Sequence, residues 1–202
     1  MRLPAFVVVA ALLLAGCGSG FERKAAEPRV YRLTPPSLAG GPGLAADLVV
    51  LRPVVAQGLR TERIASLWPG NRLDYFAGAV WAGELGAVVQ GAAVEALASG
   101  GRLRSVEGEP ARFGASHALA LEVRRFEADY VAGSPPVARV TLVATLGRAA
   151  ERRALANWTA SADVAATSNT LAGVTAALDA AFGQSLAALL AQAQAALAAD
   201  AG

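Results

Sequence analysis

Three long stretches in the second half of the chain alternate between apolar and polar or small residues. In the first, Ala115 to Tyr130, every second residue from His117 to Val123 falls on one side, with smaller or charged residues on the other. The stretches Val137 to Leu146 and Ala154 to Val164 repeat this alternation, with Gly147 and a charged segment between them. A period of two is that of a β-strand with two different faces. The pattern therefore predicts three consecutive strands in an antiparallel meander.

Shorter strands are predicted before the meander. Val30 to Leu33 alternates like a short edge strand, and Leu48 to Leu51 is a continuous apolar run bounded by Pro53, as expected of a central strand. Two short pieces, Glu62 to Leu67 and Leu73 to Phe76, flank Trp68-Pro69-Gly70-Asn71, which has turn chemistry. We expect these two pieces to form a hairpin.

Two segments have the three- and four-residue spacing of amphipathic helices. The first runs from Val80 through Trp81 to Leu97 and stops at Ser99-Gly100-Gly101, whereas the second runs from Leu171 to Leu197, with Ser168-Asn169 as its predicted cap. Because alanine is the best helix former, the second segment should be helical even where it makes few packing contacts, so its far end could project from the domain. The order of elements predicts an α+β fold: a mostly antiparallel sheet with two amphipathic helices packed on one face, in a single domain.

The beginning of the chain has the pattern of an export signal. Arg2 precedes an apolar run from Pro4 to Leu14, which is too short for a transmembrane helix. The tetrad Leu14-Ala15-Gly16-Cys17 resembles the bacterial lipobox, which implies a diacylglycerol on the Cys17 thiol, cleavage before Cys17 and acylation of the new amino group. The alternative is an ordinary signal peptide with a cysteine near the cut by chance. We expect residues 1–16 to be removed, 17–29 to form a lipidated tether and 30–202 to form the domain.

The single cysteine also bears on stability and location. An exported domain with no second cysteine has no internal disulfide, so its fold must depend on its core. Residue 18 is glycine rather than aspartate, and resemblance to lipoprotein sorting in Gram-negative bacteria then implies the periplasmic face of the outer membrane.

Composition excludes several classes of function. Basic and acidic residues nearly balance, at 18 and 16, and basic residues do not cluster with aromatic ones, so nothing indicates a nucleic-acid partner. Gly40-Gly41-Pro42-Gly43 contains a proline and lacks a following lysine, which excludes a phosphate-binding loop. With one histidine, no metal-ligand cluster is predicted, and Glu107 and Glu109 are interpreted as solvated loop residues. No cofactor is expected beyond the diacylglycerol and the N-acyl chain on Cys17.

No catalytic residues are predicted. His117 is the only histidine, and its place on the apolar face of a strand predicts a hydrogen-bonded core or strand-end residue rather than a general base. Ser185 lies in Gly183-Gln184-Ser185-Leu186-Ala187, which lacks the second glycine of a nucleophile elbow and falls inside a helix.

Aromatic residues are the best candidates for partner contact. Trp68, Tyr75 and Phe76 are the predicted contact residues, because tryptophan and tyrosine are enriched at interface hot spots. Trp68, beside the turn, is expected to be exposed to a partner protein or to lipid, whereas the helical spacing of Trp81 predicts a place in the core. Ala187 to Ala199 either docks on the sheet or mediates self-association into a homo-oligomer.

These residues together resemble the ABC-type transport auxiliary lipoprotein family, the group that includes paraquat-inducible protein C. The resemblance rests on the Cys17 lipobox, Tyr31-x-Leu33, Leu48 to Pro53, Arg63-Ile64, Trp81, Val123-x-x-Phe126 and the final helix preceded by Asp163. It implies a non-enzymatic partner of an MCE-domain protein and of an ABC permease and ATPase. The lipoprotein would dock or complete their conduit for phospholipid or another apolar substrate at the outer membrane.

Two other functions stay open from the sequence. A tethered α+β domain also suits an outer-membrane lipoprotein that activates a cell-wall synthase or assists envelope assembly. A third possibility is a lipid carrier with a cavity of its own.

Overall fold

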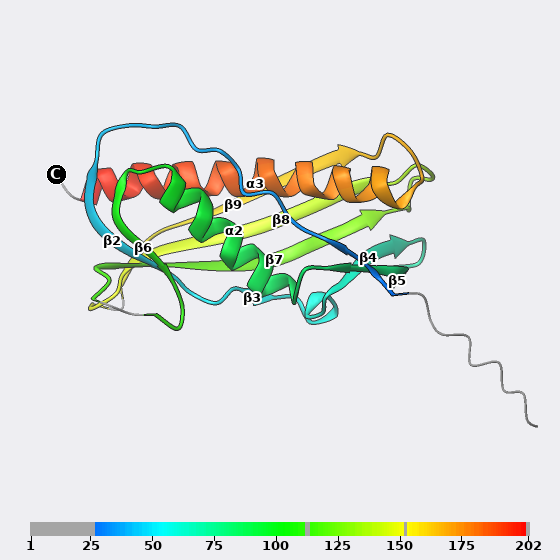
Figure 1. The fold of residues 1–202 in the computed structure, drawn as a ribbon, viewed down its shortest axis with the longest axis horizontal. Coiled ribbons are helices and arrows are strands. Elements are labelled where there is room, and N and C mark those ends of the chain that lie inside the picture. The colour runs from blue at the N-terminus through cyan, green and yellow to red at the C-terminus, as the bar shows by residue number, and fades with distance from the viewer. Residues whose placement is uncertain (1–26, 112–113, 152, 201–202) are drawn as a thin grey trace, which may run out of the picture.

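The computed structural model describes residues 27–111, 114–151 and 153–200, which form one nine-stranded sheet and two long helices. The predicted signal peptide, Cys17 and most of the predicted tether lie outside the described residues. Figure 1 shows a curled sheet with both helices on the same face. The α+β fold is therefore confirmed.

The meander is present as predicted. Strand β7 (His117–Asp129) pairs antiparallel with β8 (Val137–Arg148), which pairs antiparallel with β9 (Arg153–Ala165). Strand β8 is internal, whereas β9 pairs only with β8 and forms an edge of the sheet.

The other side of β7 is lined by parallel neighbours, which makes the sheet mixed rather than mostly antiparallel. Three strands meet β7 one after another along its length: β2 (Leu44–Val50), β3 (Val54–Val55) and β4 (Arg63–Trp68). A short 3-10 turn, Gln57–Leu59, precedes β4. Strand β6 (Leu103–Gly108) lies parallel to β2, on the side away from β7. Parallel pairing needs a crossover, which α2 (Leu85–Ser99) supplies between the first strands and β6.

The predicted hairpin joins β4 to β5 (Arg72–Trp81), and β1 (Arg29–Tyr31) is the predicted edge strand beside β5. Gly70 and Asn71 have positive φ angles of 79° and 58°, as their turn requires. Val80 and Trp81 belong to β5 and not to the first helix, which corrects the predicted helix start. The reason is that the Trp81 amide donates to the Glu62 carbonyl at 2.7 Å, which extends the hairpin. Trp81 is buried, as predicted, but from a strand.

Helices α2 and α3 (Leu171–Asp200) cover the same face of the sheet. Helix α3 contacts β7, β8 and β9, whereas α2 contacts β2, β3 and β6, and the two helices touch each other. The prediction of two helices on one face is confirmed. By length and apolar composition α3 is able to cross a membrane, but most of its apolar window is buried within the fold.

Both ends of α3 differ from expectation. Thr170, rather than Ser168-Asn169, caps the helix, because its Oγ1 accepts the Gly173 amide at 3.2 Å. The far end does not project, since Leu189, Leu190, Ala193 and Leu197 are all buried. The predicted docking of the alanine-rich half on the sheet is therefore confirmed.

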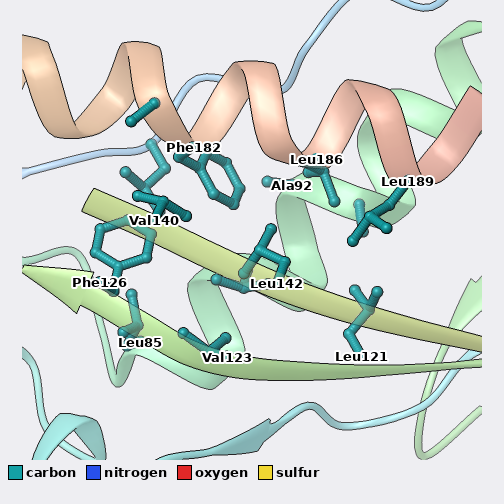
Figure 2. Packing of buried hydrophobic residues seen from close by; sticks show 14 of the residues in the cluster. Leu85, Ala92, Leu121, Val123, Phe126, Val140, Leu142, Phe182, Leu186 and Leu189 are labelled. Atoms are coloured by element: carbon teal, nitrogen blue, oxygen red, sulfur yellow. The ribbon is translucent and has the colours of Figure 1, made fainter. Parts of the chain in front are cut away.

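The core lies between the helices and the sheet (Figure 2). Phe126 of β7 joins two other aromatic rings, with centroids 5.5 Å from Trp81 and 5.9 Å from Phe182 of α3. Leu142 and Leu186 are fully buried close by. Because no disulfide is available, this packing carries the stability of the domain.

Phe182→Ala is expected to lower the free energy of unfolding by about 3–5 kcal/mol, because it leaves a cavity between α3 and β7. Urea unfolding followed by circular dichroism measures this loss. Gln184→Ala changes an exposed position in the same turn and should stay within about 0.5 kcal/mol of the parent. Equal losses in the two variants would contradict the assigned core.

Candidate functional site

The predicted contact residues lie on the β4–β5 hairpin, where Trp68 is half-buried rather than exposed. Its ring stacks on Tyr130, with centroids 4.4 Å apart and planes 2° from parallel, and its Nε1 donates to Ser66 Oγ at 3.1 Å. The Arg72 guanidinium lies 5.5 Å from the Trp68 ring centroid. Stacking on Tyr130, a buried residue that directly follows β7, explains why the expected exposure is wrong.

Phe76 and Tyr75 are also half-buried, but they lie on different faces of β5 because successive strand residues alternate. The Phe76 ring centroid is 6.5 Å from that of Tyr130, so Phe76 joins Trp68 there. Tyr75 instead donates from its hydroxyl to the Gly58 carbonyl at 2.7 Å, and the Arg63 guanidinium lies 4.1 Å from its ring centroid. The structure thus brings together two of the three predicted residues.

Tyr130 connects this part of the hairpin to the rest of the fold. Its amide donates to the Leu67 carbonyl at 2.8 Å, and its hydroxyl donates to Asn169 Oδ1 at 2.7 Å. Burial raises the pKa of Tyr130, so the hydroxyl remains a donor at neutral pH. The sequence analysis missed Tyr130 as a site residue because its neighbours come from remote parts of the chain.

The exposed apolar side chain of Val131 (53%) follows directly after Tyr130. Leu73, 38% exposed, lies on the other face of β5 with Tyr75, near Gly58. We name the surface formed by Trp68, Phe76, Tyr130 and Val131 the hairpin end. The described chain enters the fold at β1, which pairs with β5, whereas α3 ends on the opposite side of the molecule (Figure 1).

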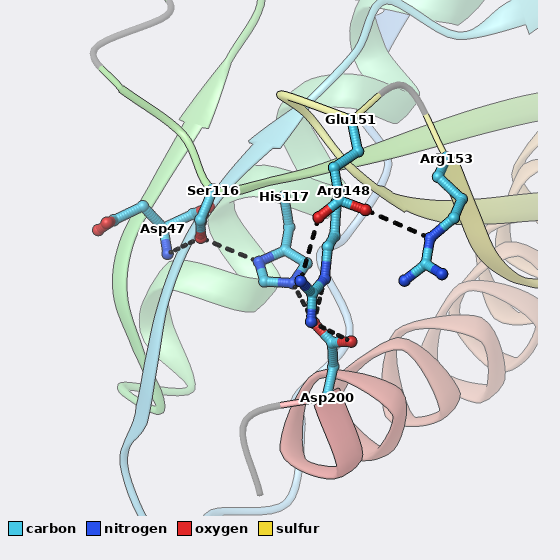
Figure 3. Close-up of polar contacts among 7 residues, drawn as sticks. All are labelled: Asp47, Ser116, His117, Arg148, Glu151, Arg153 and Asp200. Atoms are coloured by element: carbon cyan, nitrogen blue, oxygen red, sulfur yellow. Dashed lines mark hydrogen bonds and ion pairs between the residues drawn. The ribbon is translucent and has the colours of Figure 1, made fainter.

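A polar cluster lies at that opposite side (Figure 3). His117, the first residue of β7, is hydrogen-bonded through Nε2 to Asp200 Oδ2 at 3.0 Å and through Nδ1 to Ser116 Oγ at 2.9 Å. Arg148, at the end of β8, donates to both carboxylate oxygens of Asp200, at 3.0 and 2.9 Å. We name these four residues, Ser116, His117, Arg148 and Asp200, the Asp200 cluster.

The Asp200 cluster contains serine, histidine and aspartate, but its connections are structural. Ser116 Oγ lies 3.1 Å from both the amide nitrogen and the carbonyl oxygen of Asp47, so the hydroxyl is occupied by the backbone of β2. Asp200 is held mainly by Arg148 rather than devoted to orienting a base. Both ring nitrogens of His117 have partners, which confirms the predicted hydrogen-bonded strand-end histidine.

The remaining candidates also have structural roles. Glu107 lies within β6, not in a loop, which corrects that interpretation, and Glu109 accepts the Arg52 amide at 3.0 Å. Ser185 is buried in α3, with Oγ 3.5 Å from the Val140 carbonyl oxygen, so its assignment as a helix residue is confirmed. Within the described ranges, His, Cys, Asp and Glu form no group of three or more that could hold a metal ion.

Asp200→Asn is expected to lower the melting temperature in a pH-dependent manner. Hydrogen bonds from Arg148, and then from His117, lower the pKa of Asp200 from 3.8 to about 2. Because the pKa of Asp200 is lower in the folded state than in the unfolded state, its ionisation stabilises the fold above about pH 3.8. This stabilisation disappears as the pH falls through about 2. Thermal scans should therefore separate parent from variant at pH 6 and bring them together near pH 2.

The matched control is Glu95→Gln, which removes an exposed carboxylate from α2. It should show no comparable difference at pH 6. An Asp200→Asn effect of equal size at both pH values would mean that ionisation of Asp200 does not stabilise the end of α3.

The described residues thus place the hairpin end and the Asp200 cluster at opposite ends of one curled sheet. The chain belongs to the family of the ABC-type transport auxiliary lipoprotein component, whose model matches residues 31–198. The resemblance noted from the sequence is confirmed. The family also defines the protein as a lipoprotein, which is anchored to a membrane, and as an accessory to ABC-type transport.

Solved structures share this fold. Protein XCC0632 from Xanthomonas campestris is 26% identical, with a TM-score of 0.76 over 85% of this chain and 98% of that protein. An uncharacterised protein is 14% identical, with a TM-score of 0.63 over 82% and 98% of the two chains. The hypothetical protein CT253 from Chlamydia trachomatis is 12% identical, with a TM-score of 0.50 over 77% and 99%. The last two show the fold alone, and no curated protein matches this chain in sequence.

Proposed function

We propose that this lipoprotein is the periplasm-facing accessory component of an MCE/ABC-type lipid transport system. It docks the conduit at the outer membrane, or completes it there, so that phospholipid or another apolar substrate reaches the membrane. The observation that carries the proposal is membership of the ABC-type transport auxiliary family over residues 31–198. The permease and ATPase of the same system would supply the energy, and an MCE-domain protein would be the direct partner.

The anchor supports this location. Diacylglycerol and an N-acyl chain on Cys17 would give three acyl chains, whereas one chain alone gives only marginal, reversible binding. Glycine at position 18 favours the outer membrane. Residues 17–29 would then act as the tether of a single domain.

The hairpin end supports docking to a protein. It combines the half-buried rings of Trp68 and Phe76, both packed against Tyr130, with the exposed side chain of Val131. Rigid aromatic anchors beside exposed apolar groups are typical of interface hot spots. Tyr75, on the other face of β5, would contribute from the flank. Self-association into a homo-oligomer would use the outer side of α3, since the inner side is docked on the sheet.

Crosslinked envelopes should yield an MCE-domain protein when the full-length lipoprotein is purified and its partners are identified by mass spectrometry. Recovery of a cell-wall synthase, with no MCE protein, would instead support activation of cell-wall synthesis or assistance in envelope assembly. Absence of an MCE protein when the lipoprotein itself is fully recovered would contradict the proposal.

The contribution of the hairpin end is tested by Val131→Ser. This change removes an exposed apolar contact without altering the stack of Trp68 on Tyr130, and we expect MCE recovery to fall roughly tenfold, equivalent to about 1.4 kcal/mol. The control is Val54→Ser, which changes a valine of similar exposure on β3. Equal recovery from all variants would place the docking surface elsewhere. Trp68→Ala is a less selective test, because it also removes the aromatic stack.

Cys17→Ser should release the protein from the membrane fraction, because no acyl chain would be attached. Cell fractionation with immunoblotting measures the distribution. Ser19→Ala, two residues further on, should leave the protein in the outer membrane. A Cys17→Ser protein that still fractionates with the outer membrane would show that the anchor lies elsewhere.

A further inference from the structure

The face of the sheet that the helices leave open contains a groove of about 710 Å³. Its described lining comes from four strands and includes Val49 and Leu51 near β2, Ala118 and Ala120 on β7, and Arg148 and Arg153 at the ends of β8 and β9. This volume lies within the range of about 300–1,000 Å³ that is usual for small-molecule sites.

Strand β7 explains why the groove occurs at this end of the open face. Leu119 and Leu121 point toward the helices and are buried, so Ala118 and Ala120 point the other way. Further along the same open side, β7 carries Glu122 in place of these small residues, ion-paired with Arg124. An open sheet face normally carries polar side chains, so a hollow lined by alanine and aliphatic residues is unusual there.

The ionised side chains among the described lining residues are both arginines, and both lie at one end of the groove. Arg148 Nη1 and Arg153 Nε share the carboxylate of Glu151, at 3.1 and 3.4 Å. Arg148 also donates from its other two guanidinium nitrogens to Asp200, so it is committed to the Asp200 cluster. The Arg153 side chain is 62% exposed and makes its contact with Glu151 through Nε. A guanidinium in this position is suited to bidentate binding of a phosphate.

The floor determines which class of ligand fits. Strands β7 and β8 are internal, so their backbone amides and carbonyls are already used in the sheet. A peptide in the groove would bury its own backbone amides and carbonyls against β7 and β8, which have no free hydrogen-bonding groups to offer them. Burying unpaired backbone groups costs free energy. An acyl chain has no such groups, and a phosphate at its head would meet the exposed guanidinium of Arg153.

We propose that this groove binds one membrane phospholipid, with an acyl chain along Ala118 and Ala120 and the phosphate at Arg153. The inference rests on the proposed function, because it takes phospholipid as the molecule that the transport system delivers to this protein. It adds that the domain holds lipid itself, apart from any docking at the hairpin end.

Photocrosslinking of the full-length lipoprotein in its own envelope tests the inference. Benzoylphenylalanine replaces Ala154, an exposed lining residue on β9, in cells labelled with [32P]phosphate. Benzoylphenylalanine at Thr159, an exposed position of β9 outside the described lining, is the matched control. After irradiation and denaturing purification, the 32P-lipid adduct at position 154 should exceed that at position 159 roughly tenfold.

Second-site variants identify the groove as the cause of this adduct. Ala120→Trp fills the floor, and Arg153→Glu repels the phosphate, so each should reduce the adduct at position 154 roughly fivefold or more. Arg124→Glu, on the same face but outside the described lining, should not reduce it. Three results would each overturn the inference: equal adducts at the two probe positions, adducts formed only with protein, or an adduct at position 154 that Ala120→Trp does not reduce. Unchanged melting temperatures establish that the variants are folded.

Recovery of the MCE protein, measured on the same envelopes, separates the two proposals. MCE recovery without a 32P-lipid adduct overturns the groove and leaves the transport role standing. A groove-dependent adduct without MCE recovery supports the groove and contradicts the proposed conduit partner.

Discussion

The fold depends on the match between one strand and one helix. Strand β7 has 13 residues and is therefore about 43 Å long, while α3 has 30 residues and is about 45 Å long. Hydrogen bonds join the two elements at both ends: Asn169, just before α3, accepts from Tyr130, just after β7, and Asp200 is bonded to His117 at the other end. The helix therefore covers the sheet from end to end, which explains why its far end does not project.

This arrangement also fixes where the other elements lie. Strand β7 uses both of its edges, with β8 on one side and β2, β3 and β4 in succession on the other. A bulge between Val123 and Arg125 interrupts its register with β8, and bulges increase the bend of a strand. The helices occupy one face of the curled sheet, and the other face stays open. Contact surfaces are therefore available at the hairpin end and on the open face without disturbing the core.

The sequence predicted the elements whose signal is periodic and local. The alternation predicted the three strands β7, β8 and β9. The turn chemistry beside Trp68 predicted the hairpin, and the three- and four-residue spacing predicted α3. The spacing of Val80 and Trp81 also fits a helix. The hydrogen bond from the Trp81 amide to the Glu62 carbonyl places them in a strand instead. The parallel neighbours of β7 were not predictable in this way, because pairing between remote segments leaves no local period.

The candidate sites were predictable only in part, for the same reason. Trp68 and Phe76 are recognisable as aromatic residues on one hairpin, but Tyr130, which contacts both rings, follows β7 and is remote in the chain. The groove was not predictable, since its lining is contributed by four strands and the small size of Ala118 and Ala120 matters only once their neighbours are placed.

The two proposed surfaces are compatible with each other because they lie at opposite ends of β7. The hairpin end adjoins Tyr130, after the last residue of the strand, whereas the groove adjoins Ala118 and Ala120 near its beginning. The described chain enters beside the hairpin, so a tether to the membrane and a protein partner would both act at that end. A partner docked there would leave the groove open to lipid. The domain would then hold lipid at one end while it is held by membrane and partner at the other, with β7 and α3 as the rigid connection.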